Sequence, residues 1–150
     1  MFQCSVVNDA ELAAYKQRTI RALDAEKPVD VKTRAIIRAF SEWPNIATVW
    51  AFTGEVRKDG DKLRTRRHHS LTFVATEAGL KDINHLLEGW QPHEYGKRFQ
   101  LNFTWLRQEG NANLCYPSWT FRLNYRPDPD VMERVMEHWL ALAIFTEHNH

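Results

Sequence analysis

The sequence predicts an α+β domain in which a four-stranded antiparallel sheet, built from two hairpins, carries helices packed on one face. Four segments repeat apolar residues with helical spacing, and two further stretches alternate polar and apolar residues. The elements follow in the order α-α-β-β-α-β-β-α, which favours a sheet with helices gathered on one side. With 150 residues, of which 43% are hydrophobic, we expect a single α+β domain over residues 1–150.

Two helices are expected first, over residues 8–27 and 28–45. In the first, Leu12, Tyr15 and Leu23 follow helical spacing, and Asn8 or Asp9 is placed to cap the start. The second carries an apolar stripe that includes Ile36, Ile37, Phe40 and Trp43, is capped by Asp30, and stops at Pro44. Both helices therefore have one face to bury against a sheet.

A hairpin is expected over residues 48–75, because polar and apolar residues alternate there on both sides of Asp59-Gly60. That dipeptide suits a two-residue turn in which both residues have positive φ. With this loop, Leu71 and Phe73 point to the core, and Arg64, Arg66 and His68 point to solvent. Glu55 is the acidic residue that we expect on the same polar side.

A third helix (76–90) and a second hairpin (97–126) follow. Thr76 is the expected cap of the helix and Gly89 its expected terminator. In 97–108 the side chains of Phe99, Leu101, Phe103 and Trp105 alternate with those of Arg98, Gln100, Asn102 and Thr104. Arg122, Asn124 and Arg126 take the polar positions of 119–126. A two-residue loop at Gly110-Asn111 would set Phe99 against Arg122, so we expect a bulge near Pro117-Ser118 to restore the register.

The last helix starts at Asp128-Pro129 and carries a broad apolar face. This face is wide enough to cover the sheet and a second partner, which favours a homodimer. The order of the elements resembles that of the small secretion chaperones, which are homodimers. The resemblance covers element order and no motif, and those chaperones are typically acidic, whereas this chain has a net charge of +1.

A polar surface rich in arginine is the main functional candidate. If the two hairpins share one sheet, their polar sides merge into a single surface. The predicted binding residues are Arg64, Arg66, His68, Arg98, Gln100, Asn102, Arg122, Asn124 and Arg126. Arginine presents a planar fork of donors that matches carboxylates and phosphates. The alternative interpretation is an ordinary solvated sheet face, which must also be polar.

Catalytic and metal sites find less support. His68 and His69 are neighbours in a strand and point to opposite faces, so they cannot act on one substrate together. His68 beside arginines is a candidate general base for a phosphodiester-type enzyme, but no nucleophile or acid accompanies it. No metal-ligand spacing, nucleotide-binding motif or GxSxG motif occurs, so no metal, cofactor or catalytic residue is predicted.

Location and partners follow from what the sequence contains. Cys4 and Cys115 lack a CxxC spacing; whether they pair is left open, and we expect two buried thiols in a reducing compartment. No signal sequence or apolar run of membrane-spanning length is present, so we expect a cytoplasmic protein with no membrane contact. The favoured function is a non-catalytic binding module for an acidic protein surface, with duplex nucleic acid as the second choice of partner. The alternatives are the enzyme based on His68 and a homodimeric chaperone or adaptor that uses apolar helix surfaces.

Overall fold

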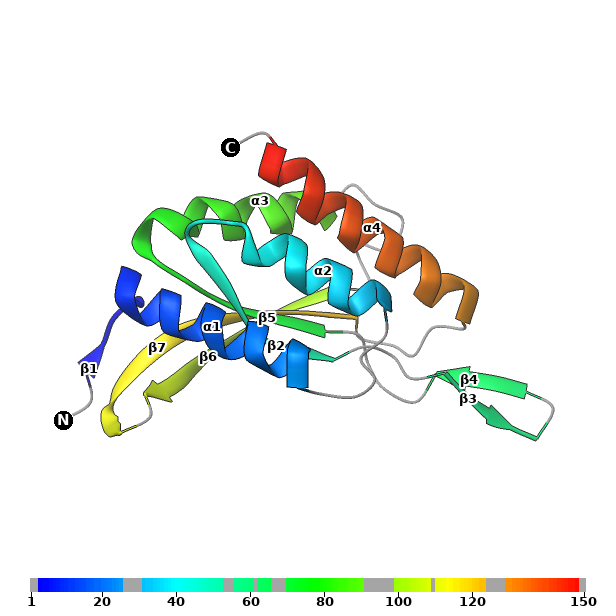
Figure 1. Ribbon diagram of the computed structural model, residues 1–150, viewed down its shortest axis with the longest axis horizontal. Helices are drawn as coiled ribbons and strands as arrows, with labels where there is room; N and C mark the ends of the chain where they lie inside the picture. The colour runs from blue at the N-terminus through cyan, green and yellow to red at the C-terminus, as the bar shows by residue number, and fades with distance from the viewer. Residues whose placement is uncertain are drawn as a thin grey trace.

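The predicted order of helices and strands is confirmed in a computed structural model of the chain (Figure 1). The structure describes residues 3–25, 31–52, 56–60, 62–65, 70–90, 99–108, 110–123 and 129–148. The helices are α1 (Asp9–Ala25), α2 (Val31–Ser41), α3 (Leu80–Trp90) and α4 (Pro129–His148), with a short 3-10 turn η1 (Glu77–Gly79) before α3. The strands are β1 (Gln3–Cys4), β2 (Ile46–Phe52), β3 (Val56–Asp59), β4 (Lys62–Thr65), β5 (Ser70–Ala75), β6 (Phe99–Gln108) and β7 (Asn111–Leu123). Within these ranges no helix is long and apolar enough to span a membrane.

The sheet has five strands and is mixed, whereas the sequence predicted four antiparallel ones. β7 pairs with β5 and β6 in antiparallel fashion and with the short β1 in parallel, and β5 pairs with β2. β1 was not foreseen, because a two-residue strand held by one distant partner leaves no periodic pattern. Its pairing sets Cys4 opposite Cys115; both thiols are free, and only Cys115 is buried, so the expected burial of Cys4 was wrong.

The predicted first hairpin is divided into two ribbons. β2 pairs with β5 in the main sheet, while β3 and β4 form a separate two-stranded sheet that projects from the body of the molecule (Figure 1). The tip of the ribbon differs from the prediction, because Asp59, which was expected in the turn, pairs with Lys62 at the end of β3. Gly60 has a φ of 64°, so it supplies the first left-handed position of the turn.

The second hairpin has the register that we predicted with a bulge, but the bulge does not lie near Pro117-Ser118. Leu101 pairs with Phe121, and the pairing continues in step through Trp105 and Pro117. The register shifts between Arg107 and Gln108, next to the turn. Pro117 is tolerated inside this strand because its nitrogen, which has no hydrogen to donate, points away from β6. On that side the Ser5 N–H donates to the Cys115 carbonyl, and the pairing with β5 ends at Trp119.

The two faces of the sheet carry different cores. We call the side of Leu71, Phe73 and Phe121 the first face; α2, α3 and α4 cover it and contribute Phe40, Ile83, Leu86 and Trp139. Phe40 lies at the centre of this core, with ring centroids 4.9 Å from Phe73 and 5.8 Å from Trp139. The Trp43 indole N–H donates to the Ala143 carbonyl across 3.0 Å, so α4 also fixes the end of α2.

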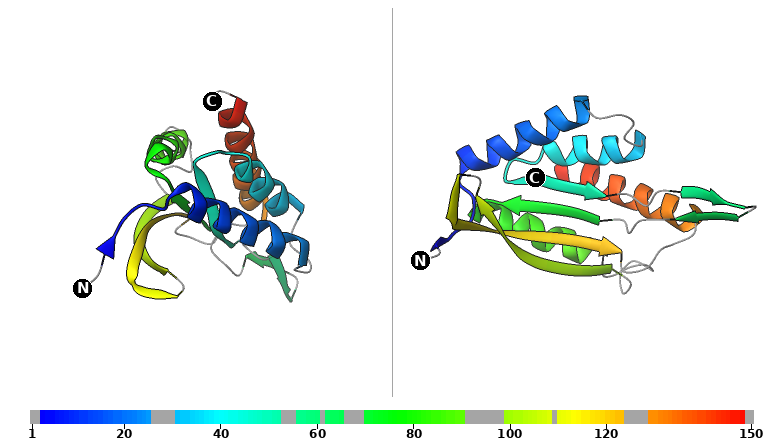
Figure 2. Two further views of the ribbon diagram at one scale, coloured as in Figure 1. Left: turned by 60° about the vertical axis from the view of Figure 1, so that its left-hand side comes forward. Right: turned by 90° about the horizontal axis from the view of Figure 1, so that it is seen from below.

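The opposite side, which we call the second face, carries Thr72, Val74, Tyr116 and Thr120. Here α1 packs Leu12 and Tyr15 against Val74 and Tyr116, which makes a smaller core at one end of the sheet. The core under α1 therefore lies on the other side of the sheet from the core under α2, α3 and α4, whereas the sequence suggested one side for all helices. In Figure 2, α1 runs beside β2 at the margin of the sheet. Asn8 caps α1 as predicted: its side chain accepts from the Glu11 N–H at 2.8 Å, and the Glu11 carboxylate accepts from the Asn8 N–H at 3.0 Å.

The residues predicted to cap and to terminate the third helix have other roles. The Thr76 side chain makes no capping bond and instead reaches the Asn45 carbonyl at 3.4 Å. Gly89 lies inside α3, which runs to Trp90, and a Cβ there would come within 2.6 Å of a Leu142 methyl carbon. Gly89 therefore allows α3 and α4 to approach closely.

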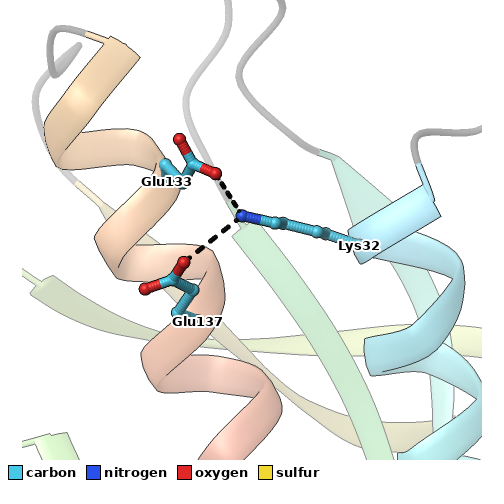
Figure 3. A network of polar contacts seen from close by, with 3 residues as sticks. All are labelled: Lys32, Glu133 and Glu137. Atoms are coloured by element: carbon cyan, nitrogen blue, oxygen red, sulfur yellow. Dashed lines mark hydrogen bonds and ion pairs between the residues drawn. The ribbon is translucent and has the colours of Figure 1, made fainter.

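Polar links join the helices. Lys32 on α2 lies between Glu133 and Glu137 on α4, at 2.5 and 3.5 Å (Figure 3). The hydrogen bond to Glu133 raises the pKa of Lys32, and the same bond lowers the pKa of Glu133. Lys16 on α1 donates to the Trp43 carbonyl, and its burial lowers its pKa although the charge of Glu42 opposes the change.

Candidate functional site

Three of the predicted binding residues are brought together on the second face. Gln100 on β6 is paired with Arg122 on β7, and Asn102 is paired with Thr120 two residues along. Gln100 is exposed, while Asn102 and Arg122 are partly exposed. None of the ion pairs between described residues involves Arg122, so its guanidinium is not committed to a carboxylate there.

Of the other six predicted residues, the structure describes one. Arg64 lies on β4, opposite Arg57, and so belongs to the projecting β3–β4 ribbon instead of the main sheet. The other five, Arg66, His68, Arg98, Asn124 and Arg126, lie outside the described residues. The merged basic surface is thus described only where β6 and β7 meet.

The polar side chains nearer the middle of the second face are buried. Ser70, Thr72 and Ser118 are at most 9% exposed. Two hydrogen bonds stay within the sheet: Thr72 and Thr120 share one of 2.8 Å, and the Ser118 hydroxyl donates to the Thr104 carbonyl at 2.9 Å. The accessible polar groups of this face therefore follow β6, with Arg122 beside them.

A row of exposed apolar side chains on β6 was not predicted as a surface. Leu101, Phe103 and Trp105 are 38%, 53% and 48% exposed. Their pairing with Phe121, Trp119 and Pro117 puts them on the first face, as the alternation indicated, but at its margin. The Phe103 ring lies 5.4 Å from that of Trp105 and 5.8 Å from that of Trp119, so the aromatic contacts run from the core to the surface.

Alternation alone could not distinguish this margin from the core. A period of two tells which side of a sheet a residue faces, whereas exposure depends on where the helices lie. Within the described ranges β6 pairs only with β7, so it forms an edge of the sheet. An edge strand with three large exposed apolar residues is the feature that proteins usually avoid unless a partner covers it.

The charge of these two strands is one-sided. Their sequences contain Arg107 and Arg122 and neither aspartate nor glutamate. A partner that lies along β6 and β7 would therefore meet positive charge, amide side chains and aromatic rings together. This combination is typical of protein-binding surfaces, which are rich in arginine and aromatic residues.

The described residues offer little support for a metal site or for catalysis. They contain no group of three histidine, cysteine or acidic side chains arranged to hold a metal ion. The chain matches no family model, no curated protein and no solved structure.

Proposed function

We propose that this chain is a non-catalytic binding module that docks an acidic, extended protein segment along the edge strand β6. One observation carries the proposal: the exposed row of Leu101, Phe103 and Trp105 lies on the same strand as Gln100 and Asn102, next to Arg122. A segment added to a sheet edge gains backbone hydrogen bonds from the strand and selectivity from alternate side chains. β6 offers apolar contacts on one face and polar contacts on the other.

The two faces of β6 have different roles in this proposal. The aromatic row supplies most of the affinity, since burying large rings at the centre of an interface dominates binding energy. Arg122, with Gln100 beside it, selects a carboxylate on the partner through charge-assisted hydrogen bonds. Such contacts steer association and weaken as salt rises. A cytoplasmic location is part of the same proposal.

The two other functions considered from the sequence remain proposals of lower rank. The phosphodiester-type enzyme depends on His68, which lies outside the described residues. A homodimeric adaptor is favoured by the same edge strand, because two copies of β6 related by a twofold axis would cover each other's aromatic row. The acidic partner ranks first because β6 and β7 contain arginines and no carboxylates. A dimer formed through β6 would bring the arginines of two copies together without opposite charges from these strands.

The test uses a fluorescent ten-residue peptide of alternating glutamate and valine, with a lysine–valine peptide as the control probe. We expect the glutamate peptide to bind in low salt, measured by fluorescence anisotropy, and the lysine peptide not to bind. Arg122→Glu should weaken binding by about 10- to 100-fold, the value of one charge-assisted hydrogen bond. The matched control Arg134→Glu, an exposed position on α4, should leave it unchanged.

A second variant separates the partner from self-association. Phe103→Ser should reduce peptide binding by about tenfold or more, because a large ring leaves the interface. Light scattering of the wild type and of Phe103→Ser over a dilution series gives the oligomeric state. Equal binding of the two peptides, or equal effects of Arg122→Glu and Arg134→Glu, would refute the acidic partner. A dimer that dissociates in Phe103→Ser would assign β6 to a second copy instead.

A further inference from the structure

The two cysteines of the chain lie opposite each other on neighbouring strands. Cys4 in β1 is the Cα partner of Cys115 in β7, and the two strands run parallel. Neighbouring strands lie about 4.8 Å apart, and the Cα atoms of disulfide-bonded cysteines are separated by about 4.4–6.8 Å. Residues paired in this way direct their side chains to the same face of the sheet. The register therefore allows a disulfide between Cys4 and Cys115, both of which are free thiols in the structure.

The two thiols differ in their access to solvent. Cys4 is exposed, whereas Cys115 is only 8% exposed. Cys115 lies inside the sheet, since it is paired with Cys4 of β1 on one side and with Arg107 of β6 on the other. A reagent in solution therefore meets Cys4 first. An accessible cysteine beside a second cysteine that can resolve it is the arrangement typical of redox-sensitive pairs.

The strand that carries Cys4 is held on β7 by few contacts. β1 has two residues, both of them exposed. Directly after β1, the Ser5 N–H donates to the Cys115 carbonyl at 3.1 Å. A short strand with little buried surface can shift by the small distance that two sulfur atoms need to reach bonding geometry. The disulfide can thus form without a change in the pairing of β5, β6 and β7.

From the register and the unequal exposure we propose that Cys4 and Cys115 form a reversible disulfide, with a small disulfide such as oxidised glutathione as the oxidant. The Cys4 thiolate attacks one sulfur of the oxidant, which breaks its S–S bond, forms a mixed disulfide and releases one glutathione thiolate. The Cys115 thiolate then attacks the Cys4 Sγ and releases the second glutathione. The two cysteines lose two electrons and two protons in total, and oxidised glutathione takes them up as two glutathione thiols.

The disulfide acts on α1 through the segment that follows β1. Val7 in this segment is 1% exposed and packs with Leu12 of α1 in the core of the second face. Asn8 then caps the helix. Further along, a cleft of about 550 Å³ remains between α1 and the strands β2, β6 and β7. A covalent bond from Cys4 to β7 therefore fixes the start of a helix that covers its end of the sheet incompletely.

The chemical test treats the reduced, dilute protein with oxidised glutathione and follows intact mass and the number of free thiols. Wild type should lose both thiols and two hydrogen atoms, carry no glutathione, and recover on addition of dithiothreitol. Peptide mapping should join the peptides that contain Cys4 and Cys115. Cys115→Ala should stop at the mixed disulfide, with one glutathione on Cys4. Cys4→Ser should react at least about tenfold more slowly, because its remaining thiol is buried.

The structural test compares oxidised and reduced wild type. A bond that closes a loop of about 110 residues should raise the melting temperature by about 5–15 °C. Hydrogen exchange should slow at the start of α1 more than in α2. The double variant Cys4→Ser/Cys115→Ala is the matched control and should melt at the same temperature with and without oxidant.

Three results would overturn the proposal: a wild-type product that keeps glutathione on Cys4, a disulfide between two molecules in place of the internal one, or equal exchange of α1 in both redox states. Wild type and Cys4→Ser suffice for this decision if Cys115→Ala does not fold. The proposed function is tested separately. β1 and β6 lie on opposite sides of Cys115, so oxidised and reduced wild type should bind the glutamate peptide equally.

Discussion

On the first face of the sheet, α2, α3 and α4 enclose Phe40, Phe73 and Trp139, all of them fully buried. On the second face α1 alone covers one end, where it leaves a cleft beside Tyr116. Neighbouring residues of β5 belong to different cores: Phe73 to the first and Val74 to the second. We infer that the first face supplies most of the free energy of folding. The second face has a smaller buried core and leaves room for a ligand.

The largest effect is expected from Phe73→Ala on the first face. Removing a fully buried phenylalanine from a close-packed aromatic core leaves a cavity that its neighbours cannot fill. We expect a loss of about 3–5 kcal/mol in the free energy of unfolding, measured by urea denaturation. A loss below about 1.5 kcal/mol, the scale of volume-conserving changes, would show that this core is loosely packed.

A smaller effect is expected from Leu12→Ala, the corresponding truncation on the second face. Leu12 is 3% exposed, but the neighbouring cleft lets the site relax. The loss should therefore be near the lower end of the usual range for leucine, about 2 kcal/mol. Hydrogen exchange should accelerate in α1 more than in α2 or α4. If Leu12→Ala costs as much as Phe73→Ala, the two faces do not differ as we propose.

The smallest effect concerns the surface link between α2 and α4. Because Lys32 lowers the pKa of Glu133, this carboxylate stabilises the folded state above its ordinary pKa of 4.5. The contribution is lost as the pH falls through the lowered pKa. Glu133→Gln should thus lower the melting temperature slightly at pH 7 and not at strongly acidic pH. A difference that is the same at both pH values would mean that charge is not its cause.

The sequence predicted elements well where a regular period repeats over many residues. The spans of α1, α3 and β6 agree closely with the apolar patterns, and the pairing of Leu101 with Phe121 follows from matching the alternation of two strands. What it missed depends on distant contacts. The parallel pairing of Gln3 with Leu114 and the packing of α1 on the second face leave no local pattern.

The site was predictable to a similar extent. Gln100, Asn102 and Arg122 were expected to lie together because their strands alternate in phase, and they do. Arg64 was misplaced because nothing in the alternation shows that the first hairpin divides after Phe52. The cleft joins Tyr15 to Tyr116, about a hundred residues later, and no spacing rule connects such residues. The exposure of the row on β6 was not predicted, because periodicity does not reveal how far the helices cover the sheet.

The hydrogen bond from the Trp43 indole to the Ala143 carbonyl spans 100 positions of the chain. Together with the β5–β7 pairing, it means that a growing polypeptide cannot bury Phe40 or Phe73 until α4 has left the ribosome. Until then, the newly made α2, β2 and β5 expose their aromatic side chains. Contacts so distant slow folding and lengthen the interval in which aggregation competes with it. Nascent chains should accordingly depend on chaperone protection until α4 has emerged from the ribosome.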